Sequence, residues 1–180
     1  MLQILNAPHE VLSKKADEIK SIDSSIVSLI KEMIDVLESA TDPIGVGLAA
    51  PQVGKSLQLF IAKPKSNSKA SVFINPKIID KKPPIKSKKG LKHKKLEGCL
   101  SLKDIWGEVE RYSQVKVEYM DEKGKKYTKV LNGFMATIVQ HEIDHLDGIL
   151  FPKRVLEQKG ILYKSERDEK GQDFFEEIKL

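Results

Sequence analysis

The chain of 180 residues contains a single cysteine, Cys99, so no disulfide can form within it. A reducing compartment is the natural expectation, because disulfide frameworks form and persist in oxidising ones. No apolar run approaches the roughly 18 residues of a membrane span, and the chain does not open with a basic region followed by an apolar stretch. We therefore expect a cytoplasmic protein without a membrane partner.

Arginine is scarce, since only three of the 31 basic residues are arginines. Eight lysines lie between residues 81 and 95, beside two prolines and a glycine, which is typical of a solvated loop. The net charge of +5 also favours RNA, so transient association with the ribosome is a second interpretation. The lack of neighbouring arginines and aromatic residues weakens the RNA interpretation, and no specific DNA partner is expected.

A phosphate-binding loop is missing as well. Residues 45–54 read Gly-Val-Gly-Leu-Ala-Ala-Pro-Gln-Val-Gly, which has neither the Gly-x-Gly-x-x-Gly spacing nor a following Gly-Lys-Ser/Thr. The small residues let main chain approach another group closely. Gln52 is the polar residue in this otherwise apolar run, and nucleotide binding is disfavoured.

What the chain does contain is His141-Glu142-x-x-His145. The residues from 133 to 146 lack proline, and apolar residues recur there at three- and four-residue steps, which predicts a helix that ends at Asp147-Gly148. Residues four apart on a helix share a face, so two imidazoles can bind one metal ion while Glu142 acts as a general base. The pattern indicates a metal-dependent hydrolase.

A catalytic site of this kind needs a third protein ligand. A histidine at position 151 would complete the metzincin pattern, but Phe151 stands there. Glutamates of the polar tail lie in a lysine-rich segment with little apolar content, which makes a poor rigid arm for a ligand. The remaining candidates are His9, His93 and Cys99. A thiolate is a strong ligand, although a lone cysteine is more often a small buried apolar residue.

Length and an apolar content of 40% suit one domain over residues 1–180, with a polar tail from about residue 157. A helix is also predicted over 23–41, and a short one near 173–178. The predicted strands are 57–62, 72–75, 115–120 and 125–130, the last two joined by a four-residue loop. This order predicts an α+β fold in which antiparallel strands surround a central helix that carries the His-Glu-x-x-His motif.

Three segments together resemble the peptide deformylase family. They are Gly45-Val-Gly-Leu-Ala-Ala-Pro-Gln52, Glu97-Gly-Cys-Leu-Ser101 and Gln140-His-Glu-Ile-Asp-His145, in the family's order. The resemblance covers about residues 1–155. One departure lies after Ser101, where Leu102-Lys103-Asp104 replaces the usual hydrophobic residue and proline.

The resemblance implies a hydrolase that removes the formyl group from the initiator methionine of N-formylmethionyl nascent peptides. Cys99, His141 and His145 would hold one divalent ion, Fe²⁺ in the cell, with Zn²⁺, Ni²⁺ or Co²⁺ able to replace it. Glu142 would be the general base. The Gln52 amide and the Leu100 backbone N–H would stabilise the oxyanion.

Substrate contacts follow from the same resemblance. Gly45 and Gly47 would let an extended peptide lie beside the main chain, and Val46, Phe134 and Ile138 would form walls of the methionine pocket, although an ordinary core role is equally open for them. Two other functions are weighed: a general metalloendopeptidase, and a catalytically silent relative that binds the ribosome or RNA.

Overall fold

The structure is a computed structural model that describes residues 2–84, 96–167 and 172–179. The larger part of the lysine-rich segment, with His93, lies outside the described residues, and so does the solvated loop predicted there. No helix in the described ranges is both long and apolar enough to cross a membrane.

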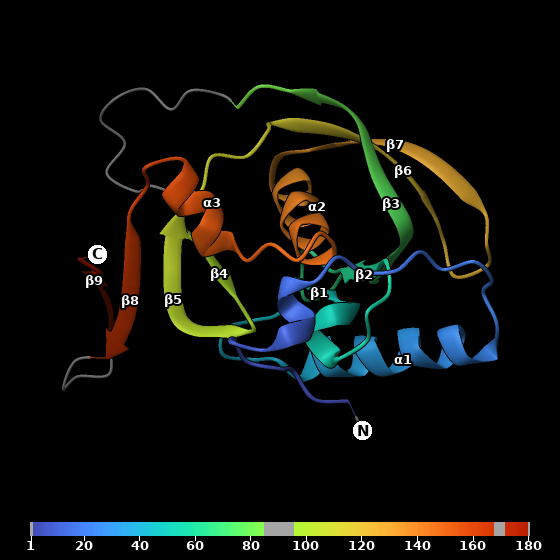
Figure 1. The fold of residues 1–180 in the computed structure, drawn as a ribbon, viewed down its shortest axis with the longest axis horizontal. Coiled ribbons are helices and arrows are strands. Elements are labelled where there is room, and N and C mark those ends of the chain that lie inside the picture. The colour runs from blue at the N-terminus through green and yellow to red at the C-terminus, as the bar shows by residue number, and fades with distance from the viewer. Residues whose placement is uncertain (1, 85–95, 168–171, 180) are drawn as a thin grey trace.

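All the named strands belong to two antiparallel sheets (Figure 1). The larger sheet has the order β1-β2-β3-β6-β7, and the smaller has the order β4-β5-β8-β9. The larger sheet comprises β1 Gly47–Ala49, β2 Leu59–Ala62, β3 Ser71–Lys82, β6 Gln114–Met120 and β7 Lys126–Asn132. The smaller comprises β4 Leu96–Cys99, β5 Leu102–Glu108, β8 Leu162–Arg167 and β9 Asp173–Glu177. The predicted α+β class with antiparallel strands is confirmed.

The motif helix, α2, spans Gly133–Leu146 as the sequence predicts. Figure 1 shows it in the middle of the molecule, and it packs against β1, β2, β6 and β7. Asn132 precedes it, but its side-chain oxygen accepts a hydrogen bond from Gln114 instead of capping the helix. The helix ends before Gly148, which has a φ of +70°. A Cβ added there would lie 2.7 Å from the Ser13 carbonyl carbon, so the position has no room for a side chain.

A second amphipathic helix, α1, spans Ser24–Ser39, slightly shorter than predicted. The Asp23 carboxylate accepts hydrogen bonds from two backbone N–H groups of its first turn, which caps the helix. Its apolar stripe packs against Leu48, Leu59 and Ile61 in one core cluster. The helix thereby supports β1, which forms one wall of the cleft described below.

The β6–β7 hairpin follows the predicted alternation, since Val115, Val117 and Tyr119 point inward and are buried. Its loop has five residues, 121–125, and not four, because β7 starts at Lys126. The Asp121 carboxylate accepts the backbone N–H groups of Lys123 and Lys125 within this loop. Strand β3 runs further than predicted because it pairs along much of β6.

The prediction of a short helix near residues 173–178 is wrong. Residues 173–177 form β9, which pairs antiparallel with β8 and extends the smaller sheet. Before it, α3 spans Phe151–Glu157 and packs on β4 and β5, with Phe151 and Val155 buried against Leu162. The polar tail therefore returns to the same sheet that carries Cys99.

Candidate active site

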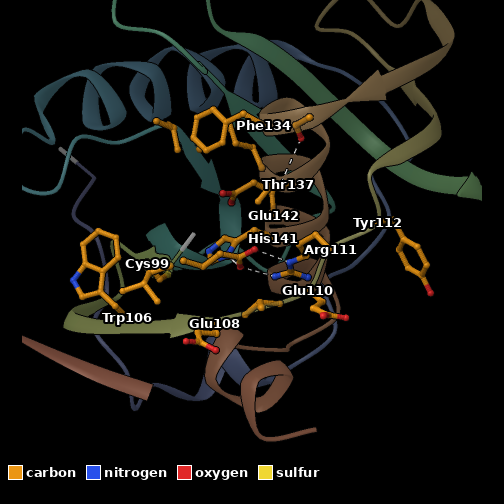
Figure 2. Close-up of a pocket in the computed structure, with 18 of the residues that line it drawn as sticks. Cys99, Trp106, Glu108, Glu110, Arg111, Tyr112, Phe134, Thr137, His141 and Glu142 are labelled. Carbon is orange, nitrogen blue, oxygen red and sulfur yellow. Dashed lines mark hydrogen bonds and ion pairs between the residues drawn. The ribbon is translucent and has the colours of Figure 1, made fainter. Parts of the chain in front are cut away.

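A cleft of about 1050 Å³ opens beside α2 (Figure 2). Its lining comes from β1 and the residues before it, from β4, from the segment that follows β5, and from α2. Gln52, Cys99, His141 and Glu142 all line this cleft. Residues that are far apart in the sequence therefore share one cavity.

Cys99, His141 and His145 each offer one ligand atom, and these atoms lie within 4.8 Å of one another. The Cys99 Sγ is 3.2 Å from the His145 Nε2. Tetrahedral bonds of about 2.0–2.3 Å separate neighbouring ligand atoms by about 3.3–3.6 Å, so one ion fits among the three with small adjustments. In the described residues this is the sole group of three or more His, Cys, Asp or Glu side chains so arranged.

The backbone at Gly98 explains how Cys99 reaches this place. A Cβ added at Gly98 would lie 2.8 Å from the Trp106 ring, so glycine lets the indole pack directly on β4. The regular pairing of β4 with β5 shifts between Gly98 and Cys99. Cys99 is left almost fully buried, and the chain turns sharply at Leu100 and Ser101 into β5.

Gln52 lies in a single 3-10 turn, Ala50–Val53, directly after β1. Its Oε1 accepts a hydrogen bond of 2.8 Å from the Ala49 backbone N–H. That bond leaves the Nε2 to donate toward the Cys99 Sγ at 3.5 Å and the Ser101 Oγ at 3.2 Å. The amide donor is therefore fixed beside Cys99, and the side chain is 2% exposed.

Glu142 is 4% exposed, and its carboxylate lies against the main chain of β1. A Cβ at Gly47 would come within 2.3 Å of the Glu142 Oε1. The Oε2 has no hydrogen-bond partner among the described residues. Burial, with a smaller contribution from the charge of Glu97, raises the pKa of Glu142 to about 7.

The two histidines differ in their surroundings. The Nδ1 of His141 lies 3.1 Å from the Glu97 carboxylate, whereas the Nδ1 of His145 has no partner in the described part of the chain. Burial opposes a charge on His141, but hydrogen bonds with Cys99 and Glu97 outweigh it and raise the pKa of that ring. Burial lowers the pKa of His145 well below its usual value.

Sequence reasoning missed the ion pairs behind His141. Arg111 binds both oxygens of Glu97 and also one oxygen of Asp144. Burial alone would raise the pKa of Glu97, but the hydrogen bonds from Arg111 and His141 outweigh it and lower the pKa to about 2. Two features of the sequence could have indicated these ion pairs. Glu97 and Asp144 stand within the motifs quoted above, and arginine, their partner, is rare in this chain.

The residues predicted to contact substrate also line the cleft. Val46 and Gly47 form its β1 side, and Phe134 and Ile138 lie on α2. Phe134 is 52% exposed, whereas Ile138 is 3% exposed and packs in the core cluster around α2. Of the other candidate ligands, His9 caps a short 3-10 helix at Glu10–Ser13 and does not belong to the group of three.

Comparison with known proteins agrees with this arrangement. The model of the polypeptide deformylase family matches residues 1–160. The chain belongs to this family. A peptide deformylase from Symbiobacterium thermophilum is 38% identical over 96% of this chain and 75% of its own length. One from Dehalococcoides mccartyi is 41% identical over 83% of each chain.

A solved structure points the same way. The crystal structure of the peptide deformylase from Thermus thermophilus superposes with a TM-score of 0.76, at 37% identity over 88% of both chains. The chain is accordingly a metal-dependent hydrolase that removes the formyl group from the initiator methionine of new polypeptides. The predicted enzyme class is confirmed.

Proposed function

We propose that Cys99, His141 and His145 hold the divalent ion, and that Glu142, Gln52 and the Leu100 backbone N–H act on the formyl amide. The observation that carries this proposal is the convergence of the three ligand atoms within 4.8 Å, in the same cleft as Glu142. Thiolate and imidazole donors suit several divalent ions. We assign Fe²⁺ as the ion in the cell, with Zn²⁺, Ni²⁺ or Co²⁺ as functional replacements.

When bound, the ion supplies a Lewis acid and lowers the pKa of a coordinated water to about 7. The protein's own share of the chemistry starts with Glu142. Its carboxylate lies in the cleft next to His141. Its Oε2, which has no hydrogen-bond partner in the described part of the chain, is able to accept a proton from the attacking water. The same oxygen can then donate that proton to the nitrogen of the leaving amine, as a general base that becomes a general acid.

Gln52 and Leu100 are proposed to stabilise the oxyanion that develops on the formyl oxygen. The Ala49 N–H fixes the Gln52 amide so that the Nε2 faces Cys99. Leu100 directly follows Cys99 at the turn into β5, which places its backbone N–H next to the proposed ligand. Loss of one such donor typically costs about 10²–10³ in turnover.

The substrate is proposed to bind along β1, which is an edge strand of the larger sheet. An extended peptide can add to such an edge through main-chain hydrogen bonds. Val46 and Gly47 would contact it there, and Phe134 and Ile138 would face the methionine side chain. At Gly47 the absence of a side chain leaves room for the Glu142 carboxylate.

We further propose that residues 1–180 act as one domain in the cytoplasm, with transient association at the ribosome. The lone, unpaired cysteine and the net charge of +5 support these assignments. Attraction of exposed lysines to ribosomal RNA would weaken steeply with salt.

The test is formate release from a formyl-methionyl peptide, with the chain loaded anaerobically with Fe²⁺ or aerobically with Ni²⁺. We expect formate and free amine in equal amounts, no reaction with the matched acetyl-methionyl peptide, and no digestion of casein. Casein cleavage without formate release would favour the endopeptidase instead. Tight, salt-dependent RNA binding by a chain that binds no metal would favour the silent relative.

A further inference from the structure

Four side chains beside the candidate metal site form a chain of hydrogen bonds, which the backbone of α2 closes into a ring. The His141 Nδ1 lies 3.1 Å from the Glu97 Oε2. Arg111 holds both oxygens of Glu97, at 2.8 and 2.9 Å, and donates a third bond of 2.6 Å to Asp144. Asp144 lies three residues after His141 on α2, so the ring starts and ends on one helix.

The ring is largely withdrawn from solvent. The side chains of Arg111, Glu97, Asp144 and His141 are between 9% and 12% exposed. Buried ion pairs seldom stabilise a fold more than well-packed apolar residues would, because removing the charges from water is costly. Stability of the fold alone therefore does not explain this arrangement. Its position next to the proposed ligands indicates a role in the metal site.

The ring joins the two elements that carry the proposed ligands. Glu97 and Cys99 lie two residues apart on β4, whereas His141 and Asp144 both belong to α2. Holding Glu97 against α2 therefore also fixes the distance from Cys99 to the histidines. Carboxylates that accept a bond from the second nitrogen of a metal-binding histidine orient its ring, and losing such partners typically lowers metal affinity 10–100-fold.

We propose that Arg111 is a positioning residue for the metal site, which orients His141 through Glu97 and clamps β4 against α2 through Asp144. This inference rests on the ligand set proposed above. The planar fork of arginine allows three directed bonds at once, which the single ammonium of lysine cannot reproduce. The chain holds only three arginines, and two of them, Arg111 and Arg154, bind Asp144.

Arg154, on α3, contacts the ring at Asp144, where its Nε and Nη2 donate to the carboxylate. Its Nη2 lies 2.7 Å from the Asp144 Oδ1, and its side chain is 31% exposed. It also pairs with Glu157 on its own helix. Three residues lie between Arg154 and His141 in the ring, whereas Glu97 alone lies between Arg111 and His141. Replacement of Arg154 should therefore weaken the metal site less than replacement of Arg111.

The test measures the dissociation constant of Zn²⁺ by chelator competition and the visible spectrum of the Co²⁺-loaded full chain. In Arg111→Lys we expect the dissociation constant to rise about 10–100-fold and the Co²⁺ spectrum to shift. Asp144→Asn should give a smaller rise, and Arg154→Lys a smaller one again. Arg167→Lys is the matched control, because Arg167 forms an exposed pair with Asp42 and neither residue is among those that line the cleft.

An unchanged dissociation constant and spectrum in folded Arg111→Lys would overturn the inference. Should that variant fail to fold, the same criterion applies to Asp144→Asn. His145→Ala separates the two proposals, since His145 is a proposed ligand outside the ring. If His145→Ala loses its metal while Arg111→Lys keeps the parental dissociation constant, only the positioning role of Arg111 is overturned. If His145→Ala retains its metal, the proposed ligand set itself is overturned.

Discussion

Glu97 and Glu142 lie in the same cleft and are both largely buried, yet they meet opposite surroundings. Arg111 holds both oxygens of Glu97, and His141 contacts one of them. Glu142 lies against the main chain at Gly47, with its Oε2 unpartnered in the described residues. The pKa of Glu97 is lowered to about 2, and that of Glu142 is raised to about 7.

Burial therefore does not decide what a carboxylate can do in this cleft. A glutamate with a pKa near neutrality can accept and return a proton, whereas one paired with arginine stays ionised and orients its partners. The contrast assigns proton transfer to Glu142 and positioning to Glu97. The following variants test the division of roles.

The largest effect is expected for Glu142→Gln. This change keeps the size of the side chain but removes the proton acceptor, so formate release should fall by about 10²–10⁴. Metal content, measured by elemental analysis, should stay at the parental value because the ligands are intact. If the variant turned over nearly as fast as the parent, a group other than Glu142 would have to be the general base.

Glu97→Gln should lower the stability of the metal-free protein and also, because Glu97 orients His141, its affinity for the metal. It removes the negative charge opposite the buried Arg111, and breaking such a pair costs about 3–5 kcal/mol. Urea unfolding of the metal-free proteins measures this loss. If Glu97→Gln instead matched Glu142→Gln in turnover and retained full stability, the two roles would be reversed.

Gly47→Ala tests whether the position of Glu142 matters as well as its chemistry. The new methyl group would lie 2.3 Å from the Glu142 Oε1, so the carboxylate must move. A displacement of this size typically costs about 10² in turnover, which steady-state kinetics would show in kcat. Gly107→Ala is the control, because its methyl group meets Val155 at 2.6 Å and should lower stability without a comparable loss in kcat per folded chain.

The smallest effect is a pH dependence of opposite sign for the two residues. The pKa of Glu97 is below the usual 4.5, so its stabilising contribution is present above pH 4.5 and is lost as the pH falls toward 2. The pKa of Glu142 is above the usual 4.5, so the stabilising contribution of Glu142 is present below pH 4.5 and is lost as the pH rises toward 7. Each slope is limited to about 1.4 kcal/mol per pH unit.

Unfolding free energies of metal-free parent and Gln variants, measured across pH, give these two slopes. The advantage of the parent over Glu97→Gln should shrink on acidification, and its advantage over Glu142→Gln should shrink between pH 4.5 and 7. Parallel slopes would show that the environments of the two carboxylates are alike.

The sequence allowed the local elements to be predicted where one face is buried. The spacing in α1 and α2 and the alternation in β6 made both helices and the hairpin readable. The tail was misjudged because Phe174-Phe175-Glu176-Glu177 has no clear period, and pairing with β8 decides its structure. Likewise, nothing local indicated α3 as the element that carries Arg154.

Within the site, the motifs gave the residues but not their partners. The spacing of His141 and His145 indicated a metal site, whereas Cys99 could be named as the third ligand only through the resemblance of its segment to a family motif. The ring through Arg111 could not, because it depends on which charges meet when β4 packs near α2. The contact between Gly47 and Glu142 was equally hidden, since 95 residues separate them in the sequence.

The most direct test of the ligand set is the metal content of Cys99→Ser, purified beside the parent and measured by elemental analysis. Far-ultraviolet circular dichroism should first show that the variant is folded. We predict about one divalent ion per parental chain and almost none in the variant, since three protein ligands are needed. One ion per chain retained in folded Cys99→Ser would contradict the account.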